Sequence, residues 1–368
     1  MIVKANWQAV IALILALAAV LNVPFFASGS QWLCVAATVL VAMAAGRSMW
    51  ATLTTFDIIL IGVLTHIAVF LLLQMLSGNE GSATSGYFIC IAACWLMGWR
   101  LVTILSGDGS RGSGEGFVGR IFVPALFGIW LLIIWEAITR GAGVPFVLLP
   151  PPSAIGVRFM SSLPILAADF YQTVLKAVLF GFCVGSFTGF LVAVLADRYK
   201  FLSNGLLPIG NVVSALPIIG IAPIMVIWFG FDWQSKAAVV IVMTFFPMLV
   251  NTIAGLKATG TMERDLMQTY AASHWQTLFK LRLPAAMPFI FNALKINSTL
   301  ALIGAIVSEF FGTPIVGMGF RISTEVGRMN LDMVWAEIAL AALVGSLFYG
   351  ALALLERTIT FWHPSYRS

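Results

Sequence analysis

Few side chains in this sequence have the types and spacing that catalysis requires. The three histidines, His66, His274 and His363, stand far apart in the chain, and no nucleophile is paired with a base. The Gly/Ser-rich stretch at 107–119 lacks the Lys-Ser/Thr ending of a phosphate-binding loop. We therefore expect no catalytic residue in this chain. His66 is isolated in an apolar run, where it is either a hydrogen-bonded packing residue or a proton carrier.

The cysteines indicate neither a metal site nor a disulfide framework. All four fall inside apolar runs: Cys34, Cys90, Cys94 and Cys183. Two of them, four residues apart, would share one face of a helix, but no further ligand lies nearby, and a metal site needs more. We interpret all four as small packing residues and predict no metal and no cofactor in this chain.

The segment 257–288 is the polar connection best suited to contact another protein. A first helix is expected around Asp265, small residues at 271–273 then give a turn, and a second helix follows at 274–283. An apolar stripe runs along the second helix: Trp275, Leu278, Phe279 and Leu283. Pro284 and Pro288 are expected to end it. Small residues at the turn allow a partner to approach closely; the alternative is an amphipathic loop that lies on lipid headgroups.

The composition is that of a membrane protein. Of the 368 residues, 60% are hydrophobic and 10% are charged, and the mean hydropathy is +1.00. Soluble domains usually carry about 25% charged residues, so too little polar surface is present to cover a water-facing globule. The same figures exclude a disordered chain. The net charge of +5 gives no reason to expect nucleic acid, because basic residues gather at cytoplasmic helix ends.

Apolar runs predict about ten membrane spans of about 20 residues each. Four precede the polar stretch, at 7–27, 31–46, 55–76 and 86–105. Six follow it, at 121–139, 174–196, 205–230, 236–255, 289–311 and 332–355. The first run could pass for a signal peptide, but its length favours a retained helix. Prolines 217 and 223 should kink or break the run at 205–230.

Two shorter patterns add detail. The run Pro150–Pro152 forbids helix, and Ser153 is a good N-cap, so an extended segment followed by a short interfacial helix is expected within 145–169. Glycines at 181, 185 and 189 form a GxxxGxxxG face, which suits close packing of two helices.

The distribution of basic residues predicts the orientation. With a cytoplasmic N-terminus and ten spans, six of the 20 Lys and Arg residues fall on the outer side. These six are Arg140, Arg158, Lys176, Lys236, Arg321 and Arg328. The other 14 fall on the cytoplasmic side, as the positive-inside rule requires. Both termini and the 257–288 connection are then cytoplasmic.

That connection resembles the EAA loop of ABC importer permeases. Asp265–Met267 stand at the Glu-Ala-Ala positions, Ala271 at the Gly position, and Leu283-Pro284 at the Leu-Pro end. Four other segments agree in the same order: Leu149–Ala154, Ala222–Gly230, Asn251–Leu256 and Ser308–Phe310, with a basic-aromatic tail at Trp362–Ser365. The resemblance covers 120–368 and is to the branch that imports sulfonates, taurine, nitrate and thiamin-pyrimidine precursors.

Two departures from the pattern matter. Ala271 replaces a glycine, and a left-handed conformation would be costly for it. Leu266 and Met267 are bulkier than the alanines of the pattern, so the docking contact is re-shaped. The coupling residues that the resemblance implies are Asp265, Leu266, Met267, Ala271, Ala272, Ser273, His274, Trp275, Leu283 and Pro284.

The resemblance implies an all-α polytopic protein with the type I ABC importer fold of about six core helices and about four extra N-terminal helices. The domains would be an extension at 1–106, a cytoplasmic linker at 107–119 and a permease core at 120–368 with a coupling loop at 261–288. The implied protein is a bacterial inner-membrane importer subunit that passes a small organic anion or a pyrimidine or vitamin precursor. Its partners would be two ATPase subunits that bind ATP and Mg, a second permease copy and an extracytoplasmic solute-binding protein.

Polar residues inside predicted spans are the candidates for a translocation pathway. In the core they are Asn211, Ser214, Asn251, Asn297, Ser298, Ser308 and Glu309. Each could instead hydrogen-bond between helices, and Glu309 and Glu136 could simply reach water. Two other functions stay open: an ion-coupled secondary transporter, although no repeat and few midplane acids are found, and a non-transporting membrane scaffold.

Overall fold

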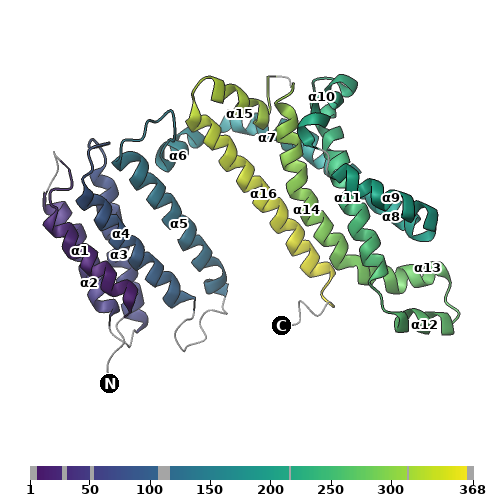
Figure 1. The fold of residues 1–368 in the computed structure, drawn as a ribbon, viewed down its shortest axis with the longest axis horizontal. Coiled ribbons are helices and arrows are strands. Elements are labelled where there is room, and N and C mark those ends of the chain that lie inside the picture. The colour runs from purple at the N-terminus through teal and green to yellow at the C-terminus, as the bar shows by residue number, and fades with distance from the viewer. Residues whose placement is uncertain are drawn as a thin grey trace. The chain divides into compact units, whose positions relative to one another are not determined.

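The computed structural model describes residues 6–26, 31–49, 54–106, 117–214, 217–312 and 315–362. Every regular element in those residues is a helix (Figure 1). Eight helices within this part are long and apolar enough to cross a membrane. The predicted all-α polytopic fold is therefore confirmed. The chain divides into two compact units, Met1–Gly156 and Val157–Ser368, which are described separately.

The first unit is a set of packed apolar helices. Its elements are α1 (Trp7–Leu21), α2 (Gln31–Ser48), α3 (Thr55–Met75), α4 (Ser85–Leu105), α5 (Phe117–Gly141) and the start of α6 (Pro152–Ser161). One stripe of α1 consists of fully buried alanines: Ala9, Ala12, Ala16 and Ala19. Their spacing places them on one side of the helix. Because alanine is small, the backbones of α1 and α4 can approach closely.

Helix α5, which sequence comparison assigned to the permease core, packs with the extension helices in the first unit. The Gly81 N–H donates a hydrogen bond to the Arg140 carbonyl at 2.8 Å. At the other end of the contact, the indole of Trp130 is buried against Gly98 of α4, where a Cβ would overlap the ring. The compact unit therefore extends to Gly156, beyond the expected linker, whose residues 107–116 lie outside the described part of the chain.

The short helix α6 begins two residues earlier than an N-cap at Ser153 would require. Pro152 is its first residue, so Ser153 is not the N-cap. The carboxylate of Glu136 takes the capping role instead, because its Oε2 accepts the Ser153 N–H at 2.9 Å and its Oε1 accepts the Ser153 hydroxyl at 2.6 Å. Proline suits the first helical position, where its missing N–H costs nothing. Glu136 is thus buried and bonded rather than in water.

The second unit is built on a bundle of long helices. Its elements are α7 (Leu163–Phe170), the π-helix η1 (Tyr171–Val178), α8 (Leu179–Arg198), α9 (Lys200–Ser214), α10 (Ile218–Phe229), α11 (Trp233–Lys257), α12 (Thr261–Thr269), α13 (His274–Thr277), the π-helix η2 (Leu278–Arg282), α14 (Leu283–Glu309), α15 (Met318–Gly327) and α16 (Leu331–Ile359). Helix α11 is central and packs against both α8 and α14. Within this unit, α12 and α13 lie at the end opposite α15 (Figure 1).

Two predicted spans differ from the structure. The run at 7–27 forms a helix of only 15 residues, α1, whose C-cap is Asn22 shortly before Pro24. The run at 205–230 is divided into α9 and α10, and α10 begins after Pro217, which is its N-cap. Pro223 was expected to act in the same way, but it lies inside an unbroken α10. The run is therefore broken at the first proline and is not broken at the second.

The glycine face predicted on α8 is a helix–helix contact. A Cβ at Gly181, Gly185 or Gly189 would overlap atoms of α11, among them the backbone carbonyl oxygens of Ala237, Ile241 and Phe245. Backbone atoms cannot move aside as a flexible side chain can, so only glycine fits. This contact fixes α8 against the central helix.

Replacing Gly185 by alanine should therefore destabilise the protein by about 1–3 kcal/mol through overpacking. Gly350→Ala in α16 is the matched control, because nothing lies within 4 Å of a Cβ there. Thermal unfolding in detergent would measure both variants. Equal stability of Gly185→Ala and the wild type would contradict the close packing of α8 on α11.

Candidate functional site

The loop between α11 and α14 begins with helix α12, which ends in a Schellman motif. Tyr270 is its C-cap, and Ala271 follows with a φ of 50°, in the left-handed region. The Ala271 N–H donates to the Gln268 carbonyl at 2.8 Å, and the Ala272 N–H donates to the Met267 carbonyl at 2.9 Å. These two bonds satisfy carbonyls at the helix end that have no partner within the helix.

Ala271 thus adopts a left-handed conformation, which glycine accepts without strain. A left-handed conformation costs an L-residue about 1–2 kcal/mol, because Cβ approaches the carbonyl oxygen. The two hydrogen bonds and the helix that follows hold the turn in this shape. Alanine at this position therefore adds strain to the turn.

A capping box starts the second helix of the loop. The Ser273 hydroxyl accepts the Gln276 N–H at 3.3 Å, and the Gln276 side chain accepts the Ser273 N–H at 2.8 Å. The Ser-x-x-Gln spacing is the usual signature of this device. Sequence reasoning did not use that signal, although it was present. The turn at Ala271–Ala272 is therefore fixed from both sides.

The loop exposes a row of large apolar side chains. Leu266, Tyr270, Trp275 and Phe279 are each more than half exposed, and the rings of Trp275 and Phe279 stack with centroids 6.0 Å apart. The expected stripe is divided, because Leu278 is only 2% exposed and packs in a core cluster with Leu256 and Ala286. One side of α13 and η2 is therefore anchored, and the other is free to contact a partner.

The helix does not end at the prolines, contrary to expectation. His274–Glu309 is one helical run of 36 residues. Pro284 stands in the first turn of α14, after the π-helical segment η2, and Pro288 lies within α14. Each proline removes one backbone N–H from the run, but the helix continues on both sides of it. Helix α13 is therefore continuous with α14, in a run long and apolar enough to cross a membrane.

The predicted coupling residues are brought together in this loop. Asp265, Leu266, Ala271, Ser273 and Trp275 are exposed. Met267, Ala272, His274, Leu283 and Pro284 are partly buried. None of the ten is fully buried, which is what a surface for a partner requires.

The predicted pathway residues are mostly buried between helices. Asn297 donates from Nδ2 to the Ser186 hydroxyl at 3.0 Å and to the Thr244 carbonyl at 2.7 Å. Ser298 and Ser308 bond to carbonyls of their own helix, and Asn251 donates to the Pro247 carbonyl. The side chains of Asn211 and Ser214 lie outside the described part of the chain.

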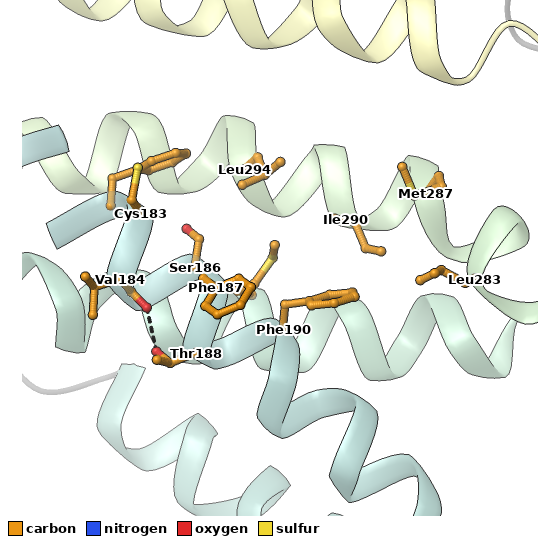
Figure 2. A pocket seen from close by; sticks show the side chains of 12 residues that line it. Cys183, Val184, Ser186, Phe187, Thr188, Phe190, Leu283, Met287, Ile290 and Leu294 are labelled. Carbon is orange, nitrogen blue, oxygen red and sulfur yellow. Dashed lines mark hydrogen bonds between the residues drawn. The ribbon is translucent and has the colours of Figure 1, made fainter. Parts of the chain in front are cut away.

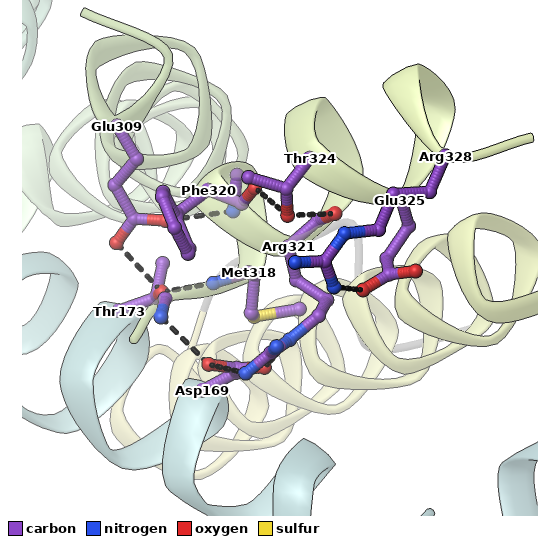
Figure 3. Close-up of polar contacts among 11 residues, drawn as sticks. Asp169, Thr173, Glu309, Met318, Phe320, Arg321, Thr324, Glu325 and Arg328 are labelled. Atoms are coloured by element: carbon purple, nitrogen blue, oxygen red, sulfur yellow. Dashed lines mark hydrogen bonds and ion pairs between the residues drawn. The ribbon is translucent and has the colours of Figure 1, made fainter. Parts of the chain in front are cut away.

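Glu309 belongs to a buried network around the start of α15 (Figure 3). Its Oε1 accepts the Thr173 hydroxyl at 2.7 Å and its Oε2 accepts the Gly319 N–H at 2.7 Å. Asp169 accepts the Gly317 N–H at 2.6 Å. Carboxylates at a helix N-terminus are stabilised by the unpaired N–H groups and the helix dipole. Glu309 is only 2% exposed, so the expectation that it could reach water is wrong.

Arg321 completes this network from α15. Its Nε donates to Asp169 Oδ2 at 2.9 Å. Burial disfavours the charged guanidinium, but the hydrogen bond and the negative charge of Asp169 outweigh it and raise the pKa of Arg321. The network joins α7, η1 and α14 to the start of α15.

An apolar cavity of about 720 Å³ lies between α8 and α14 (Figure 2). The cavity is lined by Phe187, Phe190, Met287 and Leu294. Cys183 also lines it and is exposed, whereas it was expected to pack in a core. None of its lining side chains is charged. The cavity therefore suits apolar contact rather than recognition of an anion.

The eight apolar helices of the described residues define a multi-pass membrane protein. The family of binding-protein-dependent transport system inner membrane components matches residues 181–361. The formylaminopyrimidine transport permease ThiX of Halalkalibacterium halodurans is 32% identical over 65% of this chain and 95% of its own. The chain therefore belongs to this family and is a permease subunit of an ABC importer, not the catalytic subunit.

Other relatives differ in substrate. The riboflavin permease RibX of Chloroflexus aurantiacus is 28% identical over 64% of this chain and 88% of its own. The taurine permease TauC of Escherichia coli is 28% identical over 63% of this chain and 86% of its own. Membership of the family implies an ATPase partner, which binds ATP, and a binding protein. The protein is a multi-pass inner-membrane protein.

Replacing Ala271 by glycine should stabilise the loop by about 1 kcal/mol, because glycine adopts the left-handed conformation without strain. Ala272→Gly is the control, since Ala272 has no positive φ and glycine there adds only chain entropy. Amide exchange of residues 266–279 would measure local stability. Faster exchange in Ala271→Gly than in the wild type would contradict the strain at this turn.

Proposed function

We propose that this permease moves a small solute, delivered by an extracytoplasmic binding protein, and that two ATPase subunits drive it through the loop 261–288. The observation that carries the proposal is the row of exposed apolar side chains on a turn held from both sides. Large aromatic residues are typical anchors of protein interfaces. A rigid helix continuous with a membrane span can pass a movement of the ATPases into the membrane.

The basic residues support a cytoplasmic loop and cytoplasmic termini. A second copy of this chain would complete the transporter, because two ATPases need two docking loops. Contacts between the ATPases and the docking loops that depend on nucleotide would then shift the two permease copies between inward-open and outward-open states. Family membership argues against the ion-coupled alternative and against a non-transporting scaffold.

The substrate class is proposed as a small organic anion or a pyrimidine or vitamin precursor. The names of the relatives support this range, since they include formylaminopyrimidine, riboflavin and taurine permeases. The polar residues Asn211, Ser214, Asn251, Asn297, Ser298, Ser308 and Glu309 are the proposed pathway group. Movement of the buried ones toward a cavity would require the inter-helix bonds of Asn297 and Glu309 to open.

Docking is tested by replacing both Trp275 and Phe279 with alanine. Loss of interface anchors should cost at least about 2 kcal/mol, which is roughly a 30-fold weaker complex. Co-purification with the neighbouring ATPase and surface binding assays would measure the loss. Tyr171→Ala removes an exposed aromatic ring from η1, outside the loop, and is the matched control. Undiminished ATPase binding in the double variant would overturn the proposal.

We further propose that the extension 1–106 acts as a support for α5. The tight contact of Gly98 with Trp130 and the bond from Gly81 to Arg140 support this role. The relative ThiX is covered over 95% of its length by 239 residues, so a permease of this family can be built without such an extension. In the proposed division of the chain into domains, the extension is followed by a linker at 107–119 and a permease core at 120–368.

Replacing Gly98 by valine should displace Trp130 and destabilise the first unit by about 1–3 kcal/mol. The matched control is Gly128→Val in α5, where nothing lies within 4 Å of a Cβ. Tryptophan fluorescence during thermal unfolding would measure the effect. If Gly98→Val and Gly128→Val unfold alike, α5 does not depend on the extension.

A further inference from the structure

One guanidinium joins three elements of the second unit. Arg282, the last residue of η2, donates from Nη1 and Nη2 to the two carboxylate oxygens of Asp197, each at 2.6 Å. Its Nε and Nη2 both donate to the carbonyl of Leu256 at 3.0 Å. Asp197 lies at the end of α8 and Leu256 at the end of α11. Arg282 therefore fastens the end of the docking loop to two membrane helices.

The pair is rigid because it is bidentate and largely buried. The side chain of Arg282 is 14% exposed and that of Asp197 is 6% exposed. Planar guanidinium and carboxylate groups joined by two parallel bonds have one favoured orientation, unlike a solvated surface pair. A lysine would keep the charge but lose this orientation.

The location of Asp197 favours a specific role for the pair. A negative charge near a helix C-terminus is unfavourable, because the helix dipole is negative at that end. Asp197 stands in the last turn of α8, where it needs a cation to compensate. The carbonyl of Leu256 is likewise among the last carbonyls of α11, which have no partner within the helix. Both helix ends thus depend on the same arginine.

Arg264 of α12 also donates to the Lys257 carbonyl at the end of α11, at 3.0 Å, but within the described residues it makes no bond to α8. The apolar contacts of the loop with the bundle are less directional. Leu278 packs among apolar side chains, and such contacts can slide without a fixed geometry.

The exposed rings of Trp275 and Phe279 precede Arg282 in the same helical run, which continues through η2 into α14. A displacement of the docking helix α13 must therefore move Arg282. The ion pair with Asp197 passes the movement to α8, and the bonds to the Leu256 carbonyl pass it to α11.

We propose that Arg282 and Asp197 are the joint that passes movement of the docking loop to the cytoplasmic ends of α8 and α11. This inference rests on the proposed function. The two residues act as positioning residues and touch neither the solute nor the ATPase. When the joint is broken, the ATPase should still dock and move the loop, but α8 should no longer move with it.

The test uses spin labels in the reconstituted complex with its ATPase subunits, on a Cys183→Ser background that removes the exposed cysteine. One pair, Lys280→Cys with Val326→Cys, reports the loop against α15. A second pair, Tyr199→Cys with Val326→Cys, reports the end of α8. All three positions are exposed. Distances are measured without nucleotide and with Mg-ATP and vanadate.

In the wild type both distances should shift on nucleotide addition. In Arg282→Lys and in Asp197→Asn, the loop distance should still shift while the shift at α8 is lost. The double variant Asp197→Arg with Arg282→Asp should restore the shift at α8. Arg47→Lys is the matched control, because Arg47 makes a similar bidentate pair with Asp57 in the first unit; there both shifts should remain.

If the distance at the end of α8 still shifts in both Arg282→Lys and Asp197→Asn, the proposed role of this pair is wrong. If Arg282→Lys alone fails to fold, as thermal unfolding would reveal, Asp197→Asn and the charge exchange decide the result. Failure of the proposed function looks different: the wild type then forms no ATPase complex or shows no shift at the loop.

Discussion

The structure depends on the requirement that backbone polar groups inside a membrane find partners within the protein. A regular spanning helix meets this requirement by itself. Where the helix is irregular, backbone groups that lose their partner must find another one in the protein. The second unit departs at two π-helical segments, η1 and η2. Each lies beside a charged network: Asp169 and Thr173 bind backbone N–H groups at one end, and Arg282 binds a helix-end carbonyl at the other. Helical irregularity and side-chain polarity therefore occur together, as at functional sites elsewhere.

This arrangement explains how a loop of two short helices can have a fixed position. A Schellman turn and a capping box determine its path, Leu278 anchors it, and η2 joins it to α14. Its apolar side chains remain exposed because the anchoring uses only one side of the helix. Rigidity and an unfilled apolar surface are together what a docking element needs, since ordering on binding then costs little.

Local patterns allowed much of this to be predicted. The apolar runs gave most of the spans, the glycine spacing gave the contact of α8 with α11, and the loop was located by its polarity and by resemblance. The capping box at Ser273 was equally readable but was not used. The expectation that Pro284 and Pro288 end the helix was wrong, because a proline inside a membrane helix removes one hydrogen bond without necessarily breaking the helix.

Other features depend on contacts that no local pattern contains. The Arg282–Asp197 pair joins residues 85 apart. Glu309 bonds to Thr173, which is 136 residues away. The packing of α5 with the extension uses the fit of Trp130 against Gly98 and the bond from Gly81 to the Arg140 carbonyl, which join residues far apart in the chain. Burial of these groups follows from tertiary structure, which composition and periodicity do not determine.

The proposed docking of the ATPase subunits on the loop 261–288 is tested most directly by amide exchange of the full complex, compared with the permease alone. Strong protection of the backbone from Leu266 to Phe279 is expected when the ATPase subunits are bound, with little change at α15. Protection elsewhere on the chain, with unchanged exchange in this loop, would contradict docking at this site.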